Sequence, residues 1–193
     1  MISFLKIINF LGKHYSEEFT MHELSEILKI PYASFYRCIK KIEKLKAVNI
    51  KEIGRSKVVM LNLNHPVLKS HLTASSFDEM QEFLEGHPII RKLAREIKTD
   101  DVVLLFGSYA KERQTEKSDI DLLVINKKGD KSLSFSTFEL LYKKKINPIF
   151  ITRKEFNDML KDNEENVGKQ ALKDHIILNN PEGFWELVLD AIR

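Results

Sequence analysis

Apolar side chains recur every three or four residues along the first part of the chain, which is the spacing that places them on one face of a helix. The spacing predicts one helix over residues 2–12, a second from Met21 and a third over residues 32–46. Thr20 and Glu23 have the spacing of a capping box at the start of the second helix. The side chains expected to face inward from the last two helices are Leu24, Ile27, Leu28, Phe35, Cys38, Ile39, Ile42 and Leu45.

Beyond these helices the apolar positions take up the two-residue period of β-strands. Residues 48–53 and 57–63 are predicted to form two strands around Gly54, Arg55 and Ser56. The two strands would pair as a hairpin with a basic tip.

The apolar periodicity weakens towards residues 72–76, which have the composition of a loop. We therefore expect a first domain over residues 1–70, a connecting segment over 71–85 and a second domain over 86–193, with a short helical connection between the domains and no long disordered linker. Helices are expected at this boundary over residues 77–85 and 88–98.

The second domain alternates apolar runs with amphipathic stretches. Residues 101–106 form a continuous apolar run, which is typical of a strand buried on both faces. Further strands are expected over residues 120–125 and 146–151. Helices are expected after a capping box of Thr152 and Glu155, over residues 167–177, and from Pro181 onward.

The composition is that of a folded globular protein. The chain has 193 residues, of which 43% are hydrophobic, and 12 of them are Phe, so collagen-like, coiled-coil and disordered classes are excluded. Its single cysteine excludes an intramolecular disulfide and a cysteine-based zinc site. We expect no targeting or membrane segment, no membrane partner, and a cytoplasmic location.

Positive charge is concentrated at the start of the chain. Residues 1–70 hold 12 Lys and Arg against 6 Asp and Glu, a net charge of +6, whereas residues 71–193 have a net charge of −3. The basic first part favours a polyanionic partner. Lys143, Lys144 and Lys145 form a run that is typical of a solvated helix end.

The third predicted helix is cationic on its outer face, and the hairpin after it is basic at its tip. In this order of elements residues 1–65 resemble the winged helix-turn-helix family, whose second helix enters the major groove of DNA. The resemblance implies double-stranded DNA as a partner. It assigns Ser34, Tyr36, Arg37 and Lys41 to the groove-facing surface, and Arg55 and Lys57 to phosphate or minor-groove contacts.

Two acids stand at the start of the second strand of the second domain. The two-residue period of a strand places the carboxylates of Asp119 and Asp121 on one side, with Ile120 packed beneath. Such a pair repels unless a cation lies between the carboxylates, and Mg²⁺ prefers ligands of this sort. Gly107 and Ser108, at the end of the preceding strand, offer a close backbone approach and polar groups to phosphate. The expected ligand is a nucleoside triphosphate with a divalent cation.

These residues belong to two motifs, Gly-Ser-Tyr-Ala over residues 107–110 and Ser-Asp-Ile-Asp-Leu-Leu-Val over residues 118–124. Over about residues 86–193 the chain resembles the small nucleotidyltransferases of the DNA polymerase β superfamily. The resemblance implies an α+β domain with a mixed sheet, and with the first domain it implies an α+β protein of two domains. It also implies that Gly107 and Ser108 hold the triphosphate of ATP, while Asp119 and Asp121 are catalytic and bind two Mg²⁺ or Mn²⁺ ions during nucleotide transfer.

Two positions depart from the pattern of that family. Glu112 stands where a glycine is expected, and Asn147 stands where a neighbouring strand is expected to supply a third carboxylate. An amide carries no charge and cannot act as a base. Glu139 or Asp130 would substitute for the missing acid only if the fold brings one of them to the pair.

The leading interpretation is a DNA-binding protein that transfers AMP to a hydroxyl of a protein or nucleic acid. The resemblance adds the role of an antitoxin or regulator beside a helical toxin, and a homodimer is a further expected partner state. One alternative is a non-catalytic transcription regulator whose second domain senses a nucleotide or dimerises. Another is an enzyme whose winged helix docks on protein, and the basic helix face is also compatible with a merely solvated surface.

Overall fold

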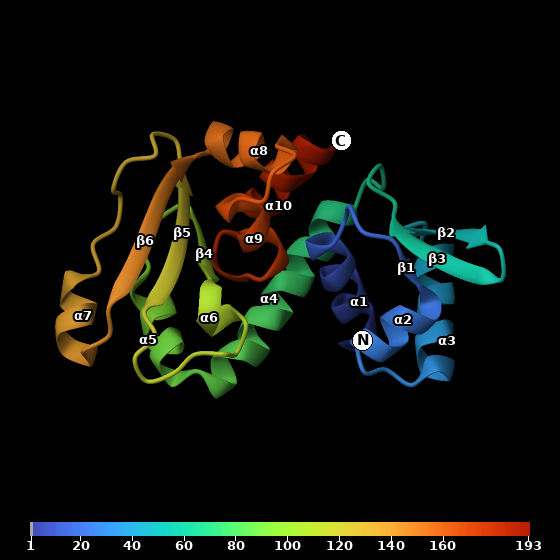
Figure 1. Cartoon of the computed structure of the whole chain (residues 1–193), viewed down its shortest axis with the longest axis horizontal. Coiled ribbons are helices and arrows are strands. Elements are labelled where there is room, and N and C mark those ends of the chain that lie inside the picture. Colours follow the sequence, from blue (N-terminus) through green and yellow to red (C-terminus); the bar gives the residue numbers. More distant parts are fainter. Residues whose placement is uncertain (1) are drawn as a thin grey trace. The chain divides into compact units, whose positions relative to one another are not determined.

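The computed structural model describes residues 2–193 (Figure 1). Met1, with which the expected first domain begins, lies outside the described residues. The chain divides into two compact units, Met1–Ser75 together with Arg193, and Ser76–Ile192. The division falls within helix α4 (Leu68–Gly86).

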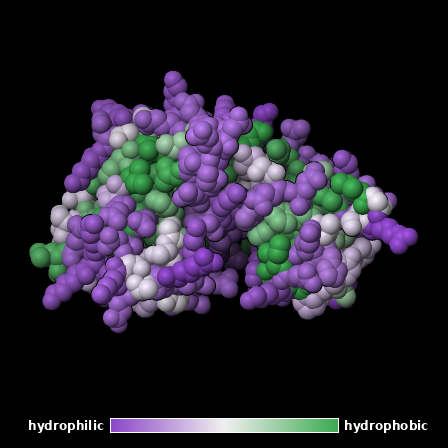
Figure 2. Space-filling view, in the orientation of Figure 1, coloured by the Kyte–Doolittle hydropathy of each residue, from purple (hydrophilic) through white to green (hydrophobic). Residues whose placement is uncertain are grey.

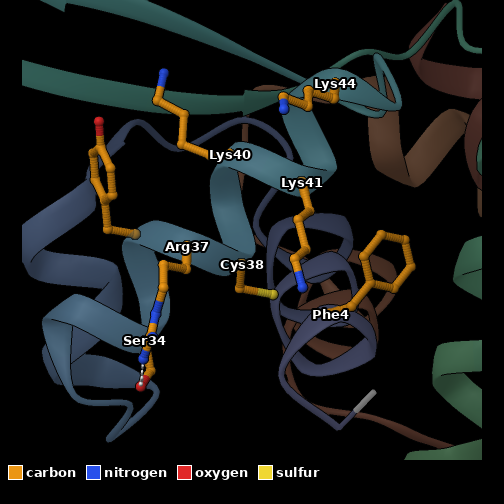
Figure 3. A pocket seen from close by; sticks show the side chains of 8 residues that line it. Phe4, Ser34, Arg37, Cys38, Lys40, Lys41 and Lys44 are labelled. Carbon is orange, nitrogen blue, oxygen red and sulfur yellow. Dashed lines mark hydrogen bonds between the residues drawn. The ribbon is translucent and has the colours of Figure 1, made fainter.

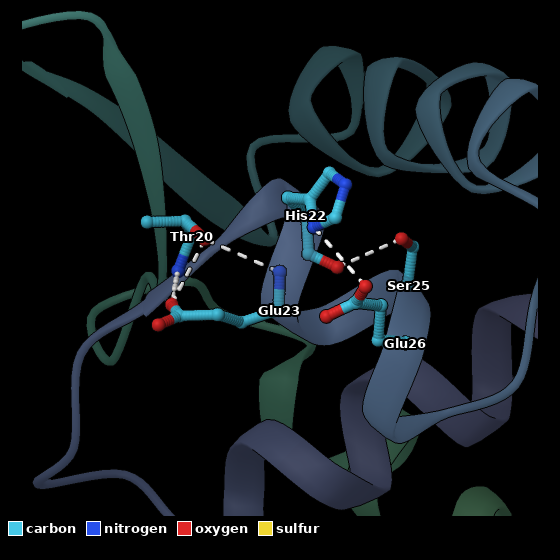
Figure 4. A network of polar contacts seen from close by, with 5 residues as sticks. All are labelled: Thr20, His22, Glu23, Ser25 and Glu26. Atoms are coloured by element: carbon cyan, nitrogen blue, oxygen red, sulfur yellow. Dashed lines mark hydrogen bonds and ion pairs between the residues drawn. The ribbon is translucent and has the colours of Figure 1, made fainter.

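The first unit begins with helices α1 (Ile2–Lys13), α2 (Met21–Ile27) and α3 (Tyr32–Lys44). The predicted capping box opens α2: Thr20 Oγ1 accepts from the Glu23 N–H at 3.2 Å, and the Glu23 carboxylate accepts from the Thr20 N–H at 2.7 Å (Figure 4). The bond from the Thr20 N–H, and then that from its hydroxyl, hold the pKa of Glu23 below its usual value. The start of α2 is therefore fixed by its own first residues.

Most side chains expected to face inward form the core of this unit, since Leu24, Phe35, Ile39 and Ile42 are all fully buried. Three expectations were wrong. Ile27 is 49% exposed because the buried side of α2 follows Met21, Leu24 and Leu28, and Leu45 is 55% exposed because α3 ends one residue earlier. Cys38 is only half-buried, since it lies at the margin of the buried stripe of α3.

A small antiparallel sheet completes the first unit. Its strands are β1 (Phe19–Thr20), β2 (Val48–Ile53) and β3 (Ser56–Leu61), in the order β1-β3-β2. β2 and β3 form the predicted hairpin, with Ile53 opposite Ser56. Gly54 takes a φ of +61° in the two-residue turn, a conformation that glycine adopts without steric cost.

The second unit is built on a four-stranded mixed sheet. Its strands are β4 (Val102–Phe106), β5 (Ile120–Asn126), β6 (Ile146–Thr152) and β7 (Ile176–Asn179), in the order β6-β5-β4-β7. β5 and β6 run parallel, while β4 is antiparallel to both β5 and β7. The mixed sheet expected from the sequence is confirmed, and β4 and β5 lie at its centre.

Helices cover both faces of this sheet. Val103 and Leu105 of β4 pack in one core with residues of α4 and of α5 (Pro88–Glu96). On the other face lie α8 (Arg153–Lys161), α9 (Val167–Lys173) and α10 (Pro181–Ile192), and α8 opens with the predicted capping box. The short helix α6 (Gly107–Ala110) follows β4, and the short helix α7 (Ser136–Tyr142) precedes β6. Burial on both faces explains the continuous apolar run of β4.

The short helical connection expected between the domains is present as part of α4, although residues 72–76 have the composition of a loop. Serine is tolerated there because Ser75 Oγ donates to the Leu72 carbonyl at 2.8 Å and Ser76 Oγ accepts from Trp185 Nε1 at 2.8 Å. One prediction of secondary structure was wrong. The helix expected over residues 167–177 ends at Lys173, and the apolar residues beyond it form β7 against β4. A short apolar run has the same pattern in a buried helix and in a buried strand.

One of the two edges of the sheet is formed by β6, and the outward N–H groups of this strand are largely taken. The Ile146 N–H donates to Glu139 Oε1 of α7 at 2.8 Å, and the Thr152 N–H donates to Glu155 Oε2 at 2.7 Å. Pro148 lies between them on the same side of the strand and has no N–H. Among the outward residues of β6, only Phe150 has an N–H for which the described side chains provide no hydrogen-bond acceptor.

Hydrophilic residues cover most of the face seen in Figure 2, and hydrophobic residues gather there in separate patches. Across residues 2–193, none of the helices is both long enough and apolar enough to traverse a lipid bilayer.

Candidate functional site

The two acids predicted as a site lie at the start of β5. Ile120 between them is fully buried in the core, and Asp119 and Asp121 are both half-exposed on the other side of the strand. Asn147 Nδ2 donates to Asp119 Oδ2 at 3.1 Å and to Asp121 Oδ1 at 3.4 Å. The two carboxylates therefore converge on one atom.

Gly107 lies directly against this pair. It follows β4, whose last residue Phe106 is the register partner of Asp121, and it has a φ of +69°. A Cβ at Gly107 would stand 2.3 Å from Asp121 Oδ2 and 3.1 Å from its Cγ, which is closer than any real side chain allows. Ser108, half-buried in α6, is the next residue. The structure therefore brings the Gly-Ser motif and the acid pair to one place.

A lysine that the sequence analysis did not select also belongs to this cluster. Lys145 Nζ lies 3.4 Å from Asp119 Oδ2, and the Lys145 carbonyl accepts from the Ile120 N–H at 2.9 Å. Lys144 beside it donates to the Glu116 carbonyl and lies 6.0 Å from the centre of the Tyr109 ring. Lys145 is solvated as expected, since its side chain is 68% exposed, but both lysines also have these contacts. The parallel pairing of β5 with β6 places them here, and no local pattern in the sequence states that pairing.

The structure places Asn147 opposite Asp121 in the register of β5 and β6, where the third carboxylate was expected. Glu139 is bound to the Ile146 N–H at 2.8 Å. Asp130 lies at the other end of β5, where its carbonyl accepts from Asn126 Nδ2 at 2.9 Å. Within residues 2–193, His, Cys, Asp and Glu side chains form no group of three or more that could hold a metal ion. The acid pair therefore has no third carboxylate in the described structure.

Glu112, in the position of an expected glycine, has a φ of +52°. This left-handed conformation favours glycine, so the backbone after α6 has the form for which a glycine would be suited. The side chain of Glu112 is exposed.

In the first unit the four residues predicted on α3 line one cavity of about 690 Å³ (Figure 3). Lys41 and Cys38 point across it towards Phe4 of α1, and burial raises the pKa of the Cys38 thiol. Among the described residues, the lining contains no acidic side chain. The full lining is Phe4, Ser34, Tyr36, Arg37, Cys38, Lys40, Lys41 and Lys44.

Hydrogen bonds order part of this cationic surface. Arg37 Nη2 lies 3.4 Å from Ser34 Oγ, and Lys40 is paired with Glu43 at 2.7 Å, a bond that raises the pKa of Lys40. Lys41 is exposed, as is Tyr36. The predicted α3 residues thus share one exposed and basic surface.

Arg55 and Lys57 belong to the β2–β3 hairpin and do not line that cavity. Arg55 is exposed in the turn. Lys57 is half-exposed and lies 3.6 Å from Glu52 across the hairpin.

Comparison with known proteins bears on the second unit. Residues 89–187 match the family described as the nucleotidyltransferase domain, and this range contains both motifs. A protein of Methanocaldococcus jannaschii that carries the provisional name protein adenylyltransferase is 43% identical over 49 residues, which are 25% of this chain and 47% of that protein.

The chain thus spans about half the length of the curated relative that it matches. No solved structure matches the chain. The family match covers more than half of the residues and includes the whole sheet with its acid pair. The chain belongs to the nucleotidyltransferase domain family.

Proposed function

We propose that the second unit binds a nucleoside triphosphate, ATP in the first instance, together with Mg²⁺ or Mn²⁺, and transfers AMP to a hydroxyl of a protein or nucleic acid. One observation carries this proposal. Gly107 is pressed against Asp121 so closely that a Cβ would stand 2.3 Å from the carboxylate, and Asp119 converges on the same point. The Gly-Ser motif and two carboxylates therefore stand side by side.

The residues of this site fit a divalent cation. Mg²⁺ is commonly held by one or two carboxylates together with substrate phosphates and water, and Asp119 and Asp121 supply the carboxylates. Asn147 can offer its amide oxygen if the side-chain amide is flipped, because its O and N positions are assigned from hydrogen bonding. When bound, the cation supplies charge neutralisation at the triphosphate.

The chain's own groups then orient the nucleotide. Gly107 lets the Asp121 carboxylate lie directly against the backbone, and Ser108 offers a hydroxyl and an N–H to phosphate beside it. Lys145, 68% exposed at the same edge, adds a positive charge that can face the triphosphate. Positioning and charge compensation are the main contributions that a protein makes to transfer at phosphorus.

A second candidate function is a regulator that binds the nucleotide without transferring it. Asn147 favours it, because an amide replaces the acid that would assist removal of the acceptor's proton. Glu112 adds a negative charge close after the Gly-Ser motif, which opposes triphosphate binding.

A labelling experiment separates the two candidates. The full chain is incubated with Mg²⁺ or Mn²⁺, ATP labelled at the α-phosphate, and proteins and RNA from cells. Transfer of label by the chain, and none by the variant Asp119→Asn with Asp121→Asn, is expected. ATP binding in calorimetry without transfer would favour the regulator. Absence of ATP binding to a folded chain would remove both candidates.

The first unit is proposed as a winged helix-turn-helix that binds duplex DNA through the outer face of α3. Support comes from its order of elements, in which a hairpin with exposed Arg55 at its turn follows three helices. Further support comes from the basic α3 surface, which carries Arg37 and Lys41. Among the described residues, the cavity beside this surface has no acidic side chain in its lining. A regulator of transcription, or an antitoxin acting beside a toxin, would use such a unit.

Gel mobility shift with duplex DNA over a salt series tests this proposal. Arg37→Ala with Lys41→Ala should weaken binding and reduce the salt slope by roughly two, because each lysine or arginine on a phosphate releases about one counterion. Lys154→Ala with Lys161→Ala, two exposed positions of α8, is the matched control and should bind as the parent does. Equal effects of the two double variants would contradict a specific role for α3.

A further inference from the structure

Two side chains from the start of β6 supply hydrogen-bond donors to the acid pair. Asn147 Nδ2 lies 3.1 Å from Asp119 Oδ2 and 3.4 Å from Asp121 Oδ1, and Lys145 Nζ lies 3.4 Å from the same Asp119 oxygen. Asn147 is held there by the β5–β6 register, in which it is the partner of Asp121. The acid pair thus has a built-in partner on the strand from which a third acid was expected.

The charges of the cluster differ from those of a site with three carboxylates. Three carboxylates carry three negative charges, and two divalent cations bring that site to a net charge of plus one. Asp119, Asp121 and Lys145 carry one negative charge between them, because the amide of Asn147 is neutral. With the same triphosphate in both kinds of site, a single divalent cation already brings this cluster to plus one. A second would bring it to plus three, with one carboxylate fewer to bind the two ions.

We propose that Lys145 and Asn147 take the place of a second divalent cation, so that this site binds a nucleoside triphosphate with one metal ion. The inference rests on the proposed function, because it concerns the same acids and the same ligand. Lys145 and Asn147 are positioning residues here: they hold the two carboxylates together before the metal ion and the nucleotide bind.

The number of bound metal ions tests this directly. The full chain is mixed with Mn²⁺ and α,β-methylene-ATP, which cannot be cleaved at the bond that nucleotide transfer breaks. Free Mn²⁺ is then counted by electron paramagnetic resonance. We expect one bound Mn²⁺ per chain. In Asn147→Asp, which adds a carboxylate at the register position of Asp121, we expect two. Asn49→Asp, the same change on exposed β2, is the matched control and should bind one.

A second variant tests the role of the Lys145 charge. The Lys145 side chain is 68% exposed, so replacing it leaves the core intact. Lys145→Met keeps most of the aliphatic stem and removes the charge that competes with a metal ion for Asp119. We expect it to bind Mn²⁺ roughly two- to fivefold more tightly in the absence of nucleotide, as loss of an exposed ion pair allows. A purely structural role for Lys145 would leave this affinity unchanged.

Each other outcome overturns the inference in a distinct way. Two Mn²⁺ ions per nucleotide in the parent chain would overturn it and leave the proposed function standing. One ion in a folded Asn147→Asp variant would show that Asn147 does not limit the site, and an unchanged or weaker affinity in Lys145→Met would exclude the competition. If the folded parent binds no nucleotide at all, both the inference and the proposed function fail.

Discussion

Replacing Gly107 by alanine tests the close approach between the turn after β4 and the acid pair. The new Cβ would stand 2.3 Å from Asp121 Oδ2, so the carboxylate has to move by about 1 Å to reach an ordinary van der Waals distance. Alanine at a φ of +69° costs about 1–2 kcal/mol, and the stiffer unfolded chain returns about 0.4–1 kcal/mol. An off-rotamer Asp121 adds about 0.5–1.5 kcal/mol.

The free energy of unfolding should therefore fall by about 0.5–3 kcal/mol in Gly107→Ala. Urea denaturation followed by the fluorescence of Trp185, the one tryptophan of the chain, reports on the second unit. Affinity for ATP with Mn²⁺, measured by calorimetry, should fall at least about tenfold, because a carboxylate displaced by about 1 Å no longer faces the cation correctly.

Gly129→Ala is the matched control for this prediction. Gly129 belongs to the same unit and has a φ of +71°. A Cβ there would meet Thr152 Cγ2 at 3.2 Å, and it would not touch Asp119 or Asp121. It bears the backbone cost without disturbing Asp121. If Gly107→Ala binds the nucleotide as tightly as Gly129→Ala, the close approach does not serve ligand binding and the reasoning is refuted.

Three further variants test single contacts of the second unit by denaturation. Glu155→Gln removes the carboxylate that accepts from the Thr152 N–H and hydroxyl at the second capping box. These bonds, that from the N–H first, lower the pKa of Glu155, so the stability lost in the variant should be full above pH 4.5 and shrink as the pH falls through the lowered value; a loss that does not change with pH would contradict this. Ser76→Ala leaves the buried indole N–H of Trp185 without its acceptor and should cost about 1–3 kcal/mol, whereas an unchanged midpoint would mean that another partner replaces the hydroxyl. Glu112→Gly relieves a φ of +52° at an exposed position and should raise the free energy of unfolding by about 0.5–1 kcal/mol; a lower value would show that the glutamate side chain stabilises the turn.

The sequence predicts this molecule best where the signal is local. Both capping boxes, the hairpin around Gly54 and the strand with Asp119 and Asp121 depend on spacings of two to four residues, and all are present in the structure. Asn147 was expected beside the acids from the resemblance to the nucleotidyltransferases, and in the register of β5 and β6 it is the partner of Asp121.

Contacts between distant segments were beyond the same reasoning. Lys145 meets Asp119 because β5 and β6 pair in parallel, and no spacing along the chain states which strands pair. The serines of α4 have the composition of a loop, and a hydrogen bond to Trp185, 109 residues away, gives one of them its place in a helix. β7 likewise becomes a strand because β4 offers it a partner.

The capped edge of β6 limits how copies of this chain can associate. Open sheet edges invite another strand to add on, and proteins suppress this with proline and with side chains that take the free N–H groups. On the outward side of β6 the amides of Ile146 and Thr152 are taken and Pro148 has none, which leaves a single donor at Phe150. Among the described residues, a strand added from another copy would meet the carbonyls of this edge but only the one N–H at Phe150, so a homodimer through this side of the unit has to rely mainly on its side chains.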